Sequence, residues 1–133
     1  MGVDVDGHKS PGNATALIEA VYKGHLAAVE LLVAANAQVN LEDNGNCTAL
    51  NAAAGAGYLD MVRALLNAGA QVDLAGYEGT TPLYWAARHG HLDVVRALLN
   101  AGADKTVDGG ESWGTPIGIA RDRGYDAIVA LLR

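Results

Sequence analysis

Apolar residues recur along the chain in pairs of short runs separated by a glycine. In the clearest copy, Leu83, Ala86 and Ala87 share one helical face at spacings i, i+3 and i+4, which predicts a first helix of about two turns. Gly90 then interrupts the pattern, as a left-handed residue at a helix end does. A second run follows, and its inward-facing positions are Leu92, Val95, Leu98 and Leu99. The pattern therefore predicts two short helices that pack together across a tight turn.

The same helix pair is repeated along the chain. The octapeptide Arg-Ala-Leu-Leu-Asn-Ala-Gly-Ala occupies residues 63–70 and occurs again at residues 96–103, displaced by 33 positions. Four units follow this register, and the threonines that open them are Thr15, Thr48, Thr81 and Thr115. The first two steps are 33 residues and the last is 34, so one residue is inserted in the third junction. A period near 33 is typical of solenoids, in which each unit packs only on its neighbours.

The residues at the expected helix ends suit those positions. Threonine is a favourable N-cap, and Pro82 and Pro116 occupy the first helical position, where proline loses no hydrogen bond. Gly69 and Gly102 end the second helix of their units, and Asn36 takes the same place in the first unit. An extended stretch and a polar tip rich in glycine and asparagine follow. Each helix pair therefore has predictable ends.

These residues resemble the ankyrin repeat over roughly residues 10 to 133. The segments that carry the resemblance most closely are Thr81–Leu83, Ala86–Ala87, Gly90–Val95, Leu98–Leu99 and Gly102–Asp104. The resemblance implies an all-α solenoid of stacked helix-turn-helix units with short β-turn or hairpin tips. It divides a single domain, residues 1–133, into repeats at about 10–41, 42–74, 75–107 and 108–133, after a lead-in over residues 1–9.

One family position differs in every unit. The histidine that follows Thr-Pro-Leu in the ankyrin repeat is replaced here by Ile18, Asn51, Tyr84 and Gly118. In the family this histidine supplies a hydrogen bond between neighbouring tips, so we expect looser tips in this chain.

Composition and charge narrow the function classes. The net charge of −6, without a basic stripe, makes direct binding of nucleic acid unexpected. No apolar run approaches the ~18 residues of a membrane span, and the N-terminus lacks a secretory core, so we expect an intracellular protein, cytoplasmic or nuclear, without membrane contact. A single cysteine, Cys47, excludes an internal disulfide. The segment Val3–Gly7 looks like the close of a preceding repeat, so we expect an array cut from a longer protein. We expect it to be monomeric, with end-to-end association through its uncapped termini as the alternative.

Two motifs invite a chemical interpretation, and neither supports one. Residues 110–114, Gly-Glu-Ser-Trp-Gly, fit the nucleophile elbow of hydrolases, but no strand precedes them and no histidine follows His91. His89 and His91 flank Gly90 without a third ligand at zinc spacing. We therefore expect no enzyme activity, no metal and no cofactor.

The resemblance implies a protein partner, because ankyrin repeats bind proteins through their hairpin tips and through a concave groove on the inner face of the first helices. By position, the tip residues carried over are Glu42, Asn44, Tyr77, Glu78, Thr80, Glu111, Ser112 and Trp113. The groove residues are Tyr22, Lys23, Trp85, Arg88, His89, Asp122 and Arg123. Gly55 and Ala56 leave room in the groove of the second unit for a partner side chain or backbone.

The same residues leave alternatives open. Tyr84 is interpreted as packing between units, whereas Trp85, Tyr77 and Trp113 fit partner contact and internal packing equally well. A structural spacer, or an engineered repeat scaffold without a native partner, is the alternative to a protein-binding module. Framework drift over residues 26–36 of the first unit favours a natural sequence.

Overall fold

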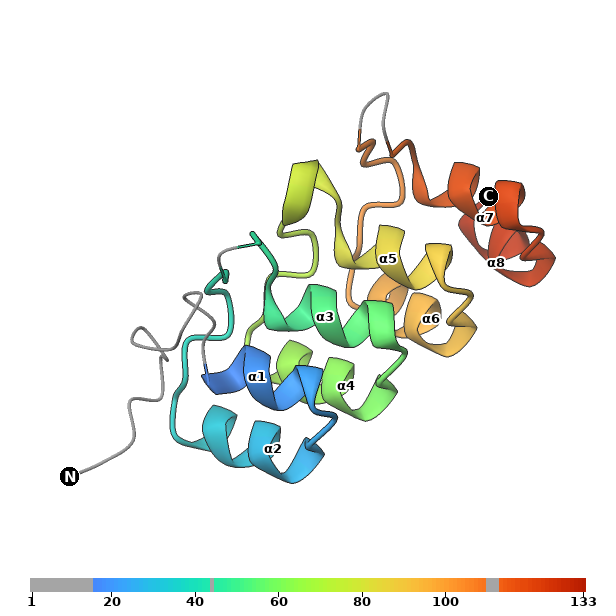
Figure 1. Cartoon of the computed structure of the whole chain (residues 1–133). Helices are drawn as coiled ribbons and strands as arrows, with labels where there is room; N and C mark the ends of the chain where they lie inside the picture. Colours follow the sequence, from blue (N-terminus) through green and yellow to red (C-terminus); the bar gives the residue numbers. More distant parts are fainter. Residues whose placement is uncertain (1–15, 44, 110–112) are drawn as a thin grey trace.

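Four helix pairs, one for each repeat, make up the part of the chain that the computed structural model describes, residues 16–43, 45–109 and 113–133 (Figure 1). The pairs are α1 (Ala16–Tyr22) with α2 (Leu26–Ala34), α3 (Ala49–Ala56) with α4 (Leu59–Asn67), α5 (Pro82–Arg88) with α6 (Leu92–Asn100), and α7 (Pro116–Arg123) with α8 (Asp126–Leu132). The predicted all-α solenoid of helix-turn-helix units is confirmed.

The pairs stack so that the first helices form one row and the second helices form another. In the first row α1 contacts α3, α3 contacts α5 and α5 contacts α7; in the second row α2, α4, α6 and α8 follow one another in the same way. The tips extend from the stack at the N-terminal ends of the first helices (Figure 1). Residues of similar register in different repeats therefore lie on one face of the molecule.

The helix ends follow the chemistry expected from the sequence. The side chains of Thr48, Thr81 and Thr115 accept hydrogen bonds from the backbone N–H groups three residues later. Asn36 has a φ of 66°, in the left-handed region where a helix commonly ends. Gly57 has a φ of 76°, and an added Cβ there would lie 2.6 Å from the imidazole of His91 in the next repeat. This glycine thus serves both the helix end and the close stacking of repeats. Thr15, the first expected cap, lies outside the described residues.

In the three tips that the structure describes, a backbone hydrogen bond joins the two sides at an equivalent place. The donor–acceptor pairs are Asp43 N to Cys47 O at 3.0 Å, Gly76 N to Thr80 O at 2.8 Å, and Gly109 N to Gly114 O at 2.9 Å. The third pair spans one residue more than the other two, which places the inserted residue of the third junction inside that tip. In the described tips the only pairing resembling a strand is an isolated antiparallel bridge between Glu42 and Thr48, so these are tight hairpins rather than a sheet.

Side chains at the bases of the tips link neighbouring repeats. Asn40 accepts a hydrogen bond from the backbone N–H of Gln71 at 2.9 Å, and the Asp73 carboxylate accepts one from Asp104 N at 2.9 Å. The two links are equivalent to each other, because the second lies 33 residues further along the chain than the first. At the family's histidine position, by contrast, Asn51 is buried, and neither its Oδ1 nor its Nδ2 has a hydrogen-bond partner within the part of the chain that the structure describes. The link that the missing histidine would supply is therefore not replaced by Asn51.

The core runs continuously through the stack between the two rows of helices. Leu65, Leu83 and Leu98 are fully buried, and alanines such as Ala86 bring the helices close together. Val94, outside the inward-facing set predicted for the second helix, is fully buried as well. The reason is that α6 packs against α4 and α8 as well as α5, so more than one of its faces is covered.

Candidate protein-binding surface

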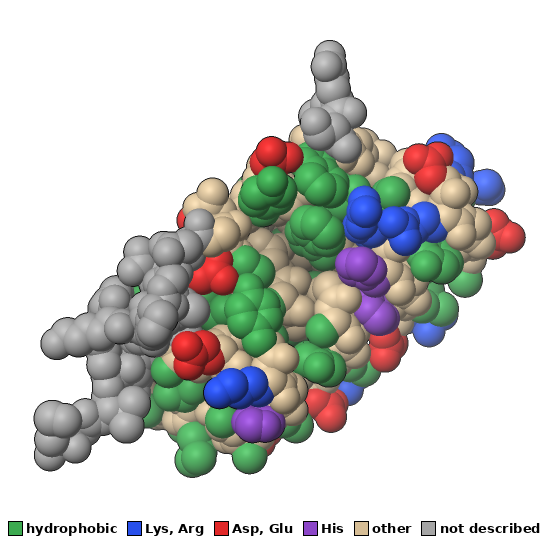
Figure 2. Space-filling view, in the orientation of Figure 1, with side chains coloured by type: hydrophobic (Ala, Val, Ile, Leu, Met, Phe, Trp, Pro, Cys, Tyr) green, Lys and Arg blue, Asp and Glu red, His purple; other side chains and the backbone are tan. Residues whose placement is uncertain are grey.

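Four aromatic side chains from the tips of the third and fourth repeats and from α5 form one cluster. These residues, called the aromatic cluster below, are Tyr77, Tyr84, Trp85 and Trp113. Trp113 is central, with ring centroids 6.1 Å from Tyr77, 6.0 Å from Tyr84 and 5.6 Å from Trp85. The Tyr77 and Tyr84 contacts are edge-to-face, the arrangement that aromatic pairs favour. Residues 36 positions apart in sequence thus meet on a single surface, where hydrophobic side chains gather beside the third tip (Figure 2).

Members of the aromatic cluster differ in exposure. Tyr84 is only 2% exposed and accepts a hydrogen bond from Arg88, so it packs between repeats as interpreted from the sequence. Tyr77 is 47% exposed, and Trp85 and Trp113 are partly exposed. Three of the four rings therefore present area to solvent, while the fourth supports them from below.

Thr80 lies inside the third tip, and its expected place among the partner-facing tip residues needs correction. Its side chain is 1% exposed. The hydroxyl donates to the backbone carbonyl of Tyr77 at 2.6 Å and accepts from the indole Nε1 of Trp85 at 2.9 Å. The residue is buried because the tip folds back onto α5 and uses the hydroxyl to satisfy both groups. Thr80 holds the aromatic cluster in place and does not itself face outward.

A cationic side chain lies beside both tryptophans. The guanidinium carbon of Arg88 is 5.9 Å from the ring centroid of Trp85 and 5.6 Å from that of Trp113, within the range of cation–π attraction. Its Nη1 donates to the hydroxyl of Tyr84 at 3.2 Å. On the other side, the indole N–H of Trp113 donates to the carboxylate of Glu78. The cluster is therefore held at both ends by side-chain hydrogen bonds.

The surroundings of His89 have a positive potential. Its ring stacks on Trp85 with centroids 6.1 Å apart and planes 16° from parallel. Partial burial lowers the pKa of His89, and the nearby His91, Arg88 and Arg123 lower it further. Figure 2 shows Lys or Arg side chains and the histidines beside the hydrophobic patch. A chain with a net charge of −6 thus carries a local cationic region next to its exposed aromatic rings.

The remaining expected contact residues lie away from the aromatic cluster. Tyr22 is 55% exposed at the end of α1, and its hydroxyl donates to Asp43 at 2.8 Å; Lys23 beside it is also exposed. Burial of the hydroxyl raises the pKa of Tyr22, and Cys47 and Asp43 add to that shift. Glu42 is exposed in the first described tip, and Asp122 is exposed near the end of α7. Asn44, Glu111 and Ser112, which were also expected to contact a partner, lie outside the described residues.

A small hollow opens between the second and third repeats beside Trp85. It has a volume of about 150 Å³, and its lining residues are Cys47, Asn51, Ala52, Gly55, Tyr77 and Trp85. The sequence pointed to Gly55 as a source of room in this groove, and the structure places it there. Asn51 and Ala52 were missed, because their part in the hollow depends on how the next repeat packs over α3.

A family comparison agrees with this geometry. The family model described as "Ankyrin repeats (3 copies)" matches residues 1–76 and residues 17–109. The chain belongs to the ankyrin repeat family. No curated protein matches the sequence. Ankyrin repeats generally mediate protein–protein interactions, and the family is typically non-catalytic.

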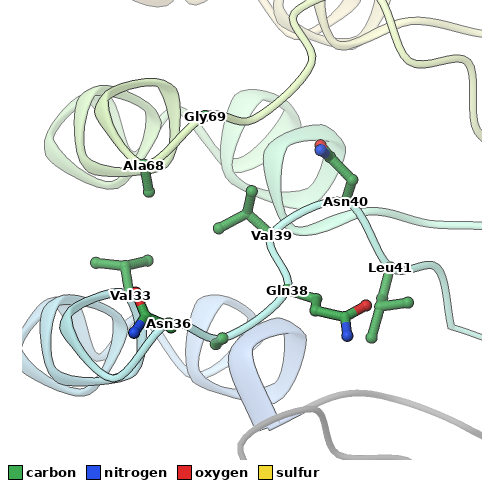
Figure 3. Close-up of a pocket in the computed structure, with 9 residues that line it drawn as sticks. Val33, Asn36, Gln38, Val39, Asn40, Leu41, Ala68 and Gly69 are labelled. Atoms are coloured by element: carbon green, nitrogen blue, oxygen red, sulfur yellow. The ribbon is translucent and has the colours of Figure 1, made fainter.

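Another hollow of this ankyrin repeat array lies away from the aromatic cluster. It has a volume of about 620 Å³ between the ends of α2 and α4, where backbone, aliphatic and amide groups line it (Figure 3). Its lining residues are Val33, Asn36, Ala37, Gln38, Val39, Asn40, Leu41, Ala68 and Gly69, and none of these has an acidic or basic side chain. Figure 3 shows its labelled residues coming from the end of α2, from the segment that follows α2 and from the residues just after α4. Within the described residues, no helix is both long enough and apolar enough to span a bilayer.

Proposed function

We infer that this chain is a non-catalytic module that binds a partner protein on the face formed by its first helices and hairpin tips. The observation that carries this function is the partly exposed aromatic cluster with Arg88 against its two indole rings. Tryptophan, tyrosine and arginine contribute most to interface energies when a partner covers them. A spacer without a partner has no need to keep such side chains ordered at its surface.

The order within the cluster supports the same function. Hydrogen bonds from Trp85 to Thr80, from Arg88 to Tyr84 and from Trp113 to Glu78 hold the rings before any partner arrives. Side chains that are fixed in advance lose little conformational entropy on binding, so more of the contact energy appears as affinity. The surface is therefore suited to recognition without rearrangement.

A capture experiment tests the proposed function. The tagged full chain and a Trp85→Ala/Arg88→Ala double variant are incubated with extract of the source cell, and retained proteins are compared by mass spectrometry. We expect a defined partner to be retained by the wild type and lost from the variant, with unchanged circular dichroism.

The matched control changes the opposite side of the molecule. Arg63 in α4 and Arg96 in α6 are exposed on the row of second helices, and the Arg63→Ala/Arg96→Ala variant should retain the partner. Retention by the groove variant together with loss in this control would contradict the proposed face. If the wild type retains no protein specifically, the spacer alternative is favoured.

A further inference from the structure

The hollow beside Trp85 has apolar walls and a small-residue floor. Trp85 and Tyr77 stand on one side, and Ala52 and Gly55 of α3 lie on the other. An added Cβ at Gly55 would lie 3.6 Å from the Cβ of Trp85 and 3.9 Å from the imidazole of His89, which is ordinary van der Waals contact, so the glycine leaves room for about one methyl group between α3 and α5. A volume of about 150 Å³ suits a single aliphatic side chain rather than a small-molecule ligand, whose pockets measure roughly 300–1,000 Å³.

One wall of the hollow is fixed in position. The indole of Trp85 is held at its nitrogen by the buried Thr80 and on its face by stacked His89. Thr80 in turn bonds to the backbone of Tyr77, which contributes the adjacent wall. The hollow is therefore a preformed feature, which lowers the entropic cost of inserting a side chain.

A cation lies next to the hollow, against one of its walls. Arg88 lies against the ring of Trp85 that lines the hollow, and it contacts the neutral hydroxyl of Tyr84 and two indole rings. Among the residues that the structure describes, no carboxylate pairs with this guanidinium. Arg123 adds to the positive potential felt at His89. A guanidinium partly desolvated by aromatic rings binds a carboxylate more strongly than one surrounded by water.

We propose that the hollow binds one aliphatic side chain of an extended partner segment, and that an Asp or Glu next to it in the partner pairs with Arg88. This inference rests on the proposed function, since it names the chemistry of the partner at the same face. The apolar residue supplies buried area, and the carboxylate selects the register by pairing with the guanidinium beside the indole of Trp85. A chain that is acidic overall thus selects an acidic segment through a local cationic site.

Selection from random peptides tests the proposal without knowledge of the natural partner. Phage-displayed random 12-residue peptides are selected against the full wild-type chain, against Arg88→Glu, and against Arg63→Glu as a control with the same change in net charge on the other side of the molecule. We expect wild-type and Arg63→Glu selections to be enriched in an aliphatic residue within two positions of Asp or Glu. The Arg88→Glu selection should replace the acidic residue with Lys or Arg.

Synthetic peptides then measure the two parts separately. Changing the selected acidic residue to Gln should weaken binding to the wild type about fivefold, the effect of a partly exposed ion pair, and should leave binding to an Arg88→Gln variant unchanged. Gly55→Ala narrows the hollow by one methyl group and should weaken a leucine-bearing peptide about tenfold. Its helix should be at least as stable as the wild type, because glycine is unfavourable inside a helix.

The outcomes separate this inference from the proposed function. Three outcomes would overturn the inferred specificity: selected peptides without acidic enrichment, equal effects of Arg88→Glu and Arg63→Glu, or no selected peptide at all. None of these outcomes bears on the proposed function, which the capture experiment tests separately. Peptides that bind Trp85→Ala as well as the wild type would instead contradict the proposed face itself. The proposal would be established if the selected peptides change from acidic to basic with Arg88→Glu, and if Gly55→Ala weakens the binding of a leucine-bearing peptide.

Discussion

Replacing Thr80 with valine tests whether this buried hydroxyl holds the aromatic cluster. Valine has nearly the shape of threonine, and the extended backbone at Thr80 (φ −78°, ψ 143°) accommodates a β-branched residue. The change therefore removes two hydrogen bonds, one to the Tyr77 carbonyl and one from the Trp85 indole, with little change in packing.

The size of the effect follows from the surroundings of the two bonds. Each hydrogen bond contributes about 0.5–1.5 kcal/mol to stability, so losing both costs about 1–3 kcal/mol. Trp85 and Tyr77 are partly exposed, and their freed groups can bond to water, which moves the expectation toward the lower end. We expect the free energy of unfolding to fall by about 1–2 kcal/mol. At a slope of about 2 kcal/mol per molar urea, the midpoint should fall by about 0.5–1 M.

Urea unfolding followed by circular dichroism and by tryptophan fluorescence measures this change. A double-mutant cycle with Trp85→Phe, which lacks the indole N–H, isolates the bond between the two side chains and should give a coupling of about 0.5–1.5 kcal/mol. Thr106→Val is the control, because its hydroxyl bonds to Asp104 at an exposed position and should matter by less than about 0.5 kcal/mol. A Thr80→Val chain as stable as the wild type, or a coupling near zero, would refute the supporting role of Thr80.

Three further changes probe the stack. Gly57→Ala should destabilise the chain more than Gly69→Ala in urea unfolding. Both glycines have positive φ, but only a Cβ at position 57 would meet the His91 ring, at 2.6 Å. Equal losses of stability would contradict the stacking argument. Asn51→Leu removes a buried amide without a partner and should leave stability unchanged or raise it by about 1 kcal/mol, whereas a loss above about 1 kcal/mol would reveal a hydrogen bond made by Asn51. The pKa of His89 is lowered in the fold, so the unfolded chain binds its proton first as pH falls below about 6.5. Stability should therefore decline there, and thermal melts of His89→Gln should show a shallower decline than the wild type; parallel profiles would argue against the shift.

The helix ends were predictable because their causes are local. Thr81 and Pro82 define where α5 begins through hydrogen bonds and dihedral limits within one turn, and Asn36 tolerates the conformation that ends a helix. The repeated octapeptide then extends one unit to its neighbours. Local chemistry and self-similarity were thus sufficient for the all-α stack and for the register of its units.

The interaction surface was predictable only in part. The sequence indicated that Trp85, Arg88 and Tyr77 lie on the face of tips and first helices, and the structure places them there. It did not indicate that Thr80 is buried, since a threonine in a polar tip gives no sign that its hydroxyl reaches an indole five residues on. Nor did it show that Arg88 contacts two indole rings, because Trp113 comes from the next repeat.

The sequence by itself determined the architecture of this protein: four helix pairs, their boundaries and the direction in which they stack. Periodicity, capping residues and left-handed positions act within a few residues of one another, so they can be read along the chain. Only the tertiary structure decided which side chains are buried, shared or left facing outward, as Val94, Asn51 and the aromatic cluster show. Those properties depend on atoms supplied by the neighbouring repeat, and the period of 33 residues places that repeat alongside without showing which of its side chains make contact.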